Sequence, residues 1–179
     1  ICERTSNFEV AIHLLLKVIG VRLELDRITI VQTDIKAREI YSDYQWNREG
    51  IPKVLETVRH FDKEDFLTVF NDFDENGVLV LQHDHMQRYS ESATKILIQG
   101  ETIVSVAMYC EGRYTGAITY AVCKEKRSWS NEMLKQLSEV TKIISAHFAK
   151  NQVMNHVYQG AITRMEHDTL TGLISFGRF

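Results

Sequence analysis

The chain has 179 residues, of which 44% are hydrophobic and 25% are charged, and its formal net charge is −3. A chain of this length fits one full domain with a short extension, and it can bury enough surface for a core of its own. The slightly negative charge provides no basic field for nucleic acid or for an anionic membrane. Because no run of about 18 apolar residues is present, we expect no membrane contact in this segment.

The cysteine content indicates free thiols rather than a disulfide framework. Cys2, Cys110 and Cys123 form neither a CxxC pair nor an even set. A sparse, odd number of cysteines is typical of a reducing compartment, so we expect a cytoplasmic location. The chain begins at Ile1 rather than at a methionine, so this expectation also allows a parent protein that is anchored to a membrane upstream.

The N-terminal half predicts a helix, two strands and two further helices. Residues 8–19 carry apolar side chains at steps of three and four, which predicts a helix that ends at Gly20. Its apolar stripe is wide enough for burial on more than one side. Later in this half, β-branched residues and the alternation of apolar with polar residues predict strands, and Pro52 suits the start of a helix. These elements are strands over residues 27–31 and 39–46, and helices over residues 52–59 and 63–71.

The C-terminal half predicts three more strands before a last, long helix. Asp-Glu-Asn-Gly at residues 74–77 is a strong turn signal, and a strand is expected directly after it. Two strands near the middle are joined by Glu-Gly-Arg, which suits a tight hairpin. The segment before them is polar. The strands are expected over residues 78–81, 102–110 and 114–122, and the polar segment covers residues 82–92.

The last helix is expected to begin after a cap at Ser130 and to run to about Met165. Its apolar residues alternate steps of four and three, which is the heptad pattern of helices that associate along their length. The pattern predicts a homodimer formed through the terminal helices, with two polar residues of the seam setting its register. The residues assigned to this dimeric signalling helix are Val140, Ile144, His147, Asn151, Met154 and Tyr158.

The order of these elements predicts the fold class. Helices at both ends and between hairpin-connected strands favour an α+β fold with a central antiparallel sheet flanked by helices. We expect the long N- and C-terminal helices to cover one face of the sheet. The middle helices and loops are expected on the other face.

Several short motifs, taken in order, resemble the GAF domain over residues 1–152. That resemblance implies an opening helix, an antiparallel sheet, a variable middle region and a closing helix that leaves as a signalling stalk. It therefore implies a sensory domain. The motifs are Tyr-Gln-Trp at residues 44–46, Glu-Gly-Ile at 49–51, Ile-Val-Ser-Val-Ala at 103–107, Gly-Arg-Tyr-Thr-Gly-Ala-Ile at 112–118 and Trp-Ser at 129–130.

The tail is similar to the opening of GGDEF domains, where Asp-x-Leu-Thr-Gly-Leu follows a signalling helix. This sequence has Asp-Thr-Leu-Thr-Gly-Leu at residues 168–173. We therefore expect a GAF domain over residues 1–152, a linker helix over 153–166 and the start of a GGDEF-like domain over 167–179. The resemblance implies GTP and Mg²⁺ for the missing downstream domain, whereas no catalytic residue or cofactor is expected in this segment.

Aromatic residues around a few polar groups predict a small-molecule pocket between the sheet and the middle helices. The same residues also suit an ordinary hydrophobic core, and that interpretation is favoured for such a set. His83-Asp84-His85 suits a metal only in part, because no third strong ligand is near, and no metal is expected. The candidate pocket residues are Tyr44, Trp46, Ile51, Phe66, Phe70, His83, His85, Tyr89 and Tyr120.

The expected function is a sensory GAF domain of a bacterial cyclic di-GMP signalling protein, a diguanylate cyclase, that passes a small-molecule or protein signal through its dimeric C-terminal helix. Ser175 and Phe176 depart from the GGDEF pattern, which leaves an alternative: a ligand-free dimerisation module before a degenerate GGDEF and phosphodiesterase output. A remote alternative is a GAF-type free methionine sulfoxide reductase that pairs Cys110 with Cys123. Neither of these two cysteines has a histidine neighbour, so no bilin attachment is expected.

Overall fold

A computed structural model of the chain describes residues 2–36, 38–53, 59–60, 62–90 and 100–150. The chain divides into two units, Ile1–Lys142 and Ile143–Phe179. The described part of the second unit, residues 143–150, is helical. All the strands of the described chain belong to the first unit. The expected linker over residues 153–166 and the GGDEF-like start over 167–179 lie outside the described residues.

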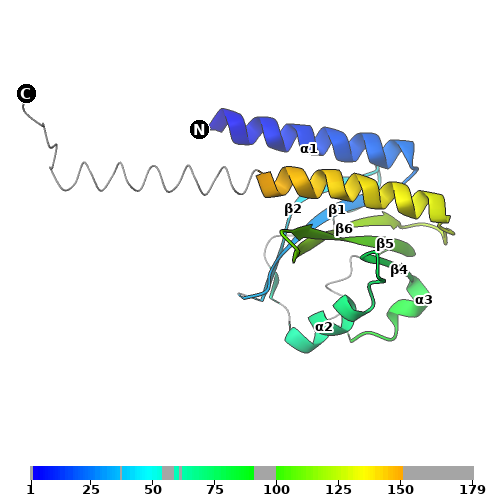
Figure 1. The fold of residues 1–179 in the computed structure, drawn as a ribbon. Helices are drawn as coiled ribbons and strands as arrows, with labels where there is room; N and C mark the ends of the chain where they lie inside the picture. Colours follow the sequence, from blue (N-terminus) through cyan, green and yellow to red (C-terminus); the bar gives the residue numbers. More distant parts are fainter. Residues whose placement is uncertain (1, 37, 54–58, 61, 91–99, 151–179) are drawn as a thin grey trace, which may run out of the picture. The chain divides into compact units, whose positions relative to one another are not determined.

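One antiparallel sheet organises the first unit, with strand order β3-β2-β1-β6-β5-β4. α1 and the helical residues 131–142 lie on one face of this sheet, and α2 lies on the other (Figure 1). The arrangement confirms the predicted α+β fold class. The helices are α1 (Cys2–Arg22), α2 (Lys63–Asn71) and α3 (His83–Met86), and a further helix covers residues 131–150. The strands are β1 (Arg27–Asp34), β2 (Glu39–Asn47), β3 (Arg59–His60), β4 (Val78–Gln82), β5 (Thr102–Cys110) and β6 (Arg113–Val122).

α1 packs on β2 through aromatic side chains of that strand. The Tyr44 ring lies edge-on to Phe8 of α1, with ring centroids 6.1 Å apart. Gly20 lies inside α1, and a Cβ added there would be 2.0 Å from the Trp46 ring. The predicted end of the helix at Gly20 is therefore wrong. A glycine here allows close approach of the indole to the helix backbone rather than stopping the helix.

The strands predicted from alternation and turn signals are confirmed to within a few residues, and so is the helix over residues 63–71. The helix predicted over residues 52–59 is wrong at both of its described ends. Residues 51–53 are not helical, and Arg59 begins β3, where it pairs with Ile40 of β2. Pairing with a neighbouring strand outweighs the weak local preference that Pro52 provides. The polar segment over residues 82–92 contains the short helix α3.

The centre of the sheet requires a glycine in β6. β1 carries an irregularity between Ile30 and Gln32, and Gly116 lies opposite Gln32 with a φ of 150°. A Cβ at Gly116 would be 2.0 Å from the backbone oxygen of Val31. Only glycine permits this close approach of the two backbones, so Gly116 allows β1 and β6 to pair at this point.

The last helix begins as predicted and is tied to the sheet by a buried hydrogen bond. The Ser130 hydroxyl accepts from the backbone N–H of Met133 at 3.2 Å, which confirms the cap. Leu137 is fully buried, and the hydroxyls of Tyr120 and Thr141 bond at 2.8 Å. Among the described helices, none has both the length and the apolar character that a bilayer crossing needs.

Candidate ligand-binding site

α2 provides the cover of a cavity on the sheet face opposite α1. Its first turn is capped by Asp62, whose carboxylate accepts from the backbone N–H of Glu64 at 2.8 Å. Apolar residues at steps of three and four then face the sheet, so that Phe66 and Val69 are buried and Phe70 is half-buried.

Aromatic rings fill the space between α2 and β6. The rings of Phe66 and Phe70 stack with centroids 5.8 Å apart. Tyr114 of β6 meets Phe70 edge-on at 5.1 Å and Phe66 at 5.8 Å. Such edge and offset contacts are the favoured arrangements of aromatic side chains, so the cluster holds α2 at a defined position on the sheet.

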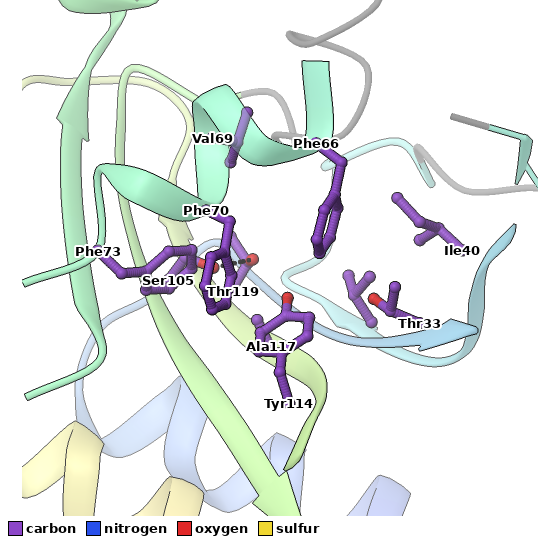
Figure 2. Close-up of a pocket in the computed structure, with 11 residues that line it drawn as sticks. Thr33, Ile40, Phe66, Val69, Phe70, Phe73, Ser105, Tyr114, Ala117 and Thr119 are labelled. Atoms are coloured by element: carbon purple, nitrogen blue, oxygen red, sulfur yellow. Dashed lines mark hydrogen bonds between the residues drawn. The ribbon is translucent and has the colours of Figure 1, made fainter. Parts of the chain in front are cut away.

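A cavity of about 30 Å³ lies beneath this cluster (Figure 2). About 10–15 Å³ is needed for one water molecule, so the cavity has room for about two. It is much smaller than the roughly 300–1,000 Å³ of ordinary ligand pockets. The lining residues are Val31, Thr33, Ile40, Phe66, Val69, Phe70, Phe73, Ser105, Tyr114, Ala117 and Thr119.

The polar groups of the cavity are hydroxyls. Ser105 and Thr119 bond each other at 3.0 Å across β5 and β6, as the dashed line in Figure 2 shows. Burial raises the pKa of Tyr114 to about 12, and a hydrogen bond with Thr33 opposes part of that rise. The cavity therefore presents neutral hydroxyls within an apolar wall at ordinary pH, a lining that suits a small and largely apolar ligand.

Of the nine pocket residues predicted from the sequence, Phe66 and Phe70 line this cavity. Tyr44, Trp46 and Tyr120 lie on the opposite face of the sheet. Tyr44 and Trp46 pack against α1, and Tyr120 bonds Thr141. Because strand side chains alternate between the two faces, the register that brings Thr119 to the cavity turns its neighbour Tyr120 away from it.

The other predicted pocket residues lie outside the cavity lining. Ile51 is half-buried after β2, where its backbone N–H donates to Arg48 O at 3.0 Å. Tyr89 is buried in a neighbouring apolar cluster, and its hydroxyl donates to Asp72. The predicted role of these residues in a pocket finds no support in the cavity lining, because the cavity lies under α2 and not under the segments that carry them.

His83 and His85 are exposed in the short helix α3, which directly follows β4. Asp84, between them, forms an ion pair with Lys126. That lysine holds the pKa of the Asp84 carboxyl below its usual value through a hydrogen bond. Within the part of the chain that the structure describes, no three histidine, cysteine or acidic residues come together to hold a metal ion.

The structure argues against pairing Cys110 with Cys123. Cys110 ends β5 beside the turn into β6, whereas Cys123 follows Val122 at the open end of the same hairpin. About ten residues at 3.3 Å each separate them by roughly 30 Å, and a disulfide needs Cα atoms within about 7 Å. Burial also raises the pKa of the Cys123 thiol, which disfavours the nucleophilic thiolate.

Residues of β1, β5 and β6 that line the cavity were missed by sequence reasoning. These are Val31, Thr33, Ser105, Tyr114, Ala117 and Thr119, together with Ile40 of β2, Val69 of α2 and Phe73 just after α2. Alternation along β6 does group Ala117 with Thr119. However, alternation alone does not say which face of a strand meets α2, because that depends on pairing between strands far apart in the chain.

The predicted signalling helix is described only as far as residue 150. Val140 is half-buried, Ile144 is buried and His147 is exposed. Asn151, Met154 and Tyr158 lie outside the described residues. Thr141, whose hydroxyl bonds that of Tyr120 in β6, is not among the residues of the predicted heptad pattern.

The fold is similar to those of several solved sensory proteins. The GAF domain of PixJ from Thermosynechococcus elongatus, in its blue-light absorbing form, aligns with a TM-score of 0.66 and 15% identity, covering 91% of this chain and 95% of that chain. A bacteriophytochrome from R. palustris has a TM-score of 0.65 and 13% identity, covering 96% of this chain and 40% of that chain. The GAF domain of a two-component sensor histidine kinase from Bacillus halodurans has a TM-score of 0.55 and 13% identity, covering 73% and 86%.

No family model matches the chain, and no curated protein matches it in sequence. At 13–15% identity, the solved structures inform the fold and not the ligand or the activity. Their shared fold nevertheless agrees with the resemblance of this sequence to the GAF domain. The antiparallel sheet, with α1 and residues 131–142 on one face and α2 on the other, gives this chain the fold of a GAF domain.

Proposed function

We propose that this chain is a sensory domain of a bacterial cyclic di-GMP signalling protein. In this proposal, a small molecule or a protein contact changes the packing beneath α2. The change passes through the sheet to the helix that begins after Ser130, and this helix alters how two output domains face each other. GTP and Mg²⁺ then belong to the downstream domain, whose opening the tail resembles.

One observation supports the proposal most directly. Thr119 lines the cavity, and the next residue of β6, Tyr120, bonds Thr141 of the last helix at 2.8 Å. Tyr120 is fully buried, and Thr141 is 1% exposed. A displacement of β6 at the cavity therefore acts on the helix through one peptide unit and one buried hydrogen bond, which is a physical contact of the kind that coupling requires.

A homodimer is part of this proposal, and α1 supports it. Val10, Leu14, Val18 and Val21 are 64%, 61%, 53% and 62% exposed. Their spacing places them along one stripe of the helix. A contiguous apolar stripe left in water is costly and marks an interaction surface. A second copy of α1 carries the same stripe, so an isologous contact buries both.

The cavity volume of about 30 Å³ favours a second candidate. With so little free space beneath α2, the domain can serve as a ligand-free dimerisation module that spaces the output domains. Binding of a metabolite then requires displacement of Phe66 and Phe70, which cover the cavity. The two candidates differ in whether any ligand stabilises the fold.

Two measurements test these functions in order. The natural protein extended beyond Phe179 is incubated with GTP and Mg²⁺ and assayed for cyclic di-GMP. Formation of cyclic di-GMP supports a cyclase. A folded dimer that forms no product contradicts cyclase activity, and hydrolysis of cyclic di-GMP is then measured instead. Thermal shift against a metabolite library then tests sensing, because a ligand of the folded state raises the midpoint with the logarithm of its concentration. No shift with any compound favours the spacer function.

A further inference from the structure

Three consecutive residues that follow α3 are hydrogen-bonded to both ends of α2. The Ser90 hydroxyl donates to Asp65 Oδ1, in the first turn of the helix, at 2.7 Å. At the other end, the C-cap Asp72 accepts from the Tyr89 hydroxyl and, at 3.1 Å, from the guanidinium of Arg88. Asp65 and Asp72 are about 10 Å apart along the helix axis, so this three-residue segment holds α2 at two separate points. We call it the strap.

The contacts at Asp72 form a closed network around one carboxylate. Arg88 also donates to the Tyr89 hydroxyl at 2.8 Å, and its guanidinium carbon lies 4.9 Å from the centroid of the Tyr89 ring. Burial and the hydrogen bond to Asp72 raise the pKa of Tyr89, so its hydroxyl stays protonated and donates to the carboxylate. Hydrogen bonds to a charged group are stronger than neutral ones. The network therefore fixes the strap against the C-terminal end of α2.

Asp72 suits the strap better than it suits the helix. A carboxylate at the C-terminal end of a helix lies against the negative end of the helix dipole, which destabilises the helix. The last turn of α2 carries no basic residue, so the compensating cation comes from Arg88 of the strap. A helix of nine residues is also too short to be stable in water without tertiary contacts. The position of α2 therefore depends on contacts such as those of the strap.

The strap is itself anchored in the core beside the cavity. Tyr89 is 7% exposed and belongs to an apolar cluster that includes Leu79 of β4 and Val69 of α2. α2 therefore leaves the sheet only by breaking the strap bonds or by pulling Tyr89 out of this cluster. The cavity holds about 30 Å³, so a ligand of ordinary size requires Phe66 and Phe70, both carried by α2, to move. Binding under α2 is thus linked to release of the strap.

We propose that the strap regulates the access of small apolar molecules to the space under α2. While its bonds to Asp65 and Asp72 are intact, Phe66 and Phe70 stay on the sheet and the site is closed. When these bonds break, α2 moves away from the sheet and the site accepts an apolar molecule. The fraction of protein in the open state then sets the apparent affinity. This inference rests on the proposed sensor function, because it concerns the regulation of the same site.

The first experiment measures amide hydrogen exchange of the full chain at low urea concentrations, without ligand. Tyr89→Phe combined with Ser90→Ala removes both strap hydroxyls and keeps the buried ring. We expect the amides of α2 to exchange through a local opening, with a weaker urea dependence than the amides of β6. The double variant should lower the protection of α2 about tenfold, because hydrogen bonds to carboxylates are lost. Exchange of α2 only through global unfolding, or unchanged protection, would overturn the inference.

The second experiment measures the binding of benzene by NMR titration. We expect about tenfold tighter binding to the double variant than to the wild type, matching the factor found by hydrogen exchange, because the open state is then more populated. Asp84→Asn breaks the ion pair of α3 with Lys126 and leaves the strap intact, so this matched control should keep the wild-type values in both experiments. Ser90→Ala alone, at an exposed position, should change both values in the same direction by a smaller factor.

The outcomes separate this inference from the proposed function. Benzene that binds neither protein, or binds both equally well, overturns the strap. A metabolite that binds under α2 with the same affinity in the wild type and the double variant also overturns the strap but supports the sensor function. Strap variants that open α2 and tighten benzene binding support the inference, even where no metabolite stabilises the fold and the sensor function therefore fails.

Discussion

Burial sets the ionisation of the two tyrosines of β6. It raises the pKa of Tyr114 to about 12 and that of Tyr120 further still. In the unfolded chain, tyrosine ionises near pH 10. The folded state thus keeps protons that the unfolded state loses, so the stability contributed by these groups is complete below pH 10 and is lost as pH rises toward the folded pKa.

This pKa difference predicts alkaline destabilisation. Above pH 10, each tyrosine lowers the free energy of unfolding by about 1.4 kcal/mol per pH unit. Tyr114→Phe removes one such group, so we expect a shallower decline between about pH 10 and 11 than in the wild type. Urea unfolding of both proteins at about pH 10 and 11 measures this decline in the free energy of unfolding. Identical slopes for wild type and Tyr114→Phe would contradict the burial of that hydroxyl.

Gly20 makes a second prediction at the residue scale. An added Cβ would be 2.0 Å from the Trp46 ring, so Gly20→Ala must displace the indole or α1. We expect a loss of about 1–3 kcal/mol in stability, which is typical of overpacking. Gly20→Ala combined with Trp46→Leu should be less destabilised than the sum of the two single changes. Additive losses in chemical denaturation would show that the two residues do not touch.

At the scale of elements, the sheet and the last helix are joined by the bond between Tyr120 and Thr141. Thr141→Val leaves the buried Tyr120 hydroxyl without a partner, so we expect a loss of about 1–3 kcal/mol. Thr141→Ser keeps a hydroxyl at the same position and is the matched control, with a smaller loss expected. In the extended protein, Thr141→Val should also weaken the response of the output to ligand. An unchanged response would show that the hydrogen bond between Tyr120 and Thr141 does not transmit the signal.

The secondary structure shows where local reasoning suffices and where it fails. α2 was predicted with its observed bounds because its apolar spacing is a property of adjacent residues. β3 was missed because two residues, Arg59 and His60, form a strand only by pairing with β2. The cap at Ser130 was predicted from one residue type, and the hydrogen bond to Met133 confirms it.

At the scale of the whole molecule, the exposed stripe of α1 predicts association. The full chain should be a dimer, and Leu14→Glu with Val21→Glu should weaken it because charges then replace the apolar contact. Glu9→Lys changes charge outside the stripe and serves as the control. Light scattering across a concentration series measures the effect. A monomeric wild type, or a double variant that associates equally well, would contradict the dimer.

The sequence by itself determined the order of the elements and the α+β class, because hydrophobic period, turn residues and caps act over a few neighbouring positions. Only the tertiary structure decided which aromatic residues meet. β1 pairs with both β2 and β6, and that register turns Thr29 and Thr119 toward the cavity face and Tyr120 toward the last helix. A shift of one residue would exchange the two faces, and no local pattern specifies pairing between strands as distant in the chain as β1 and β6.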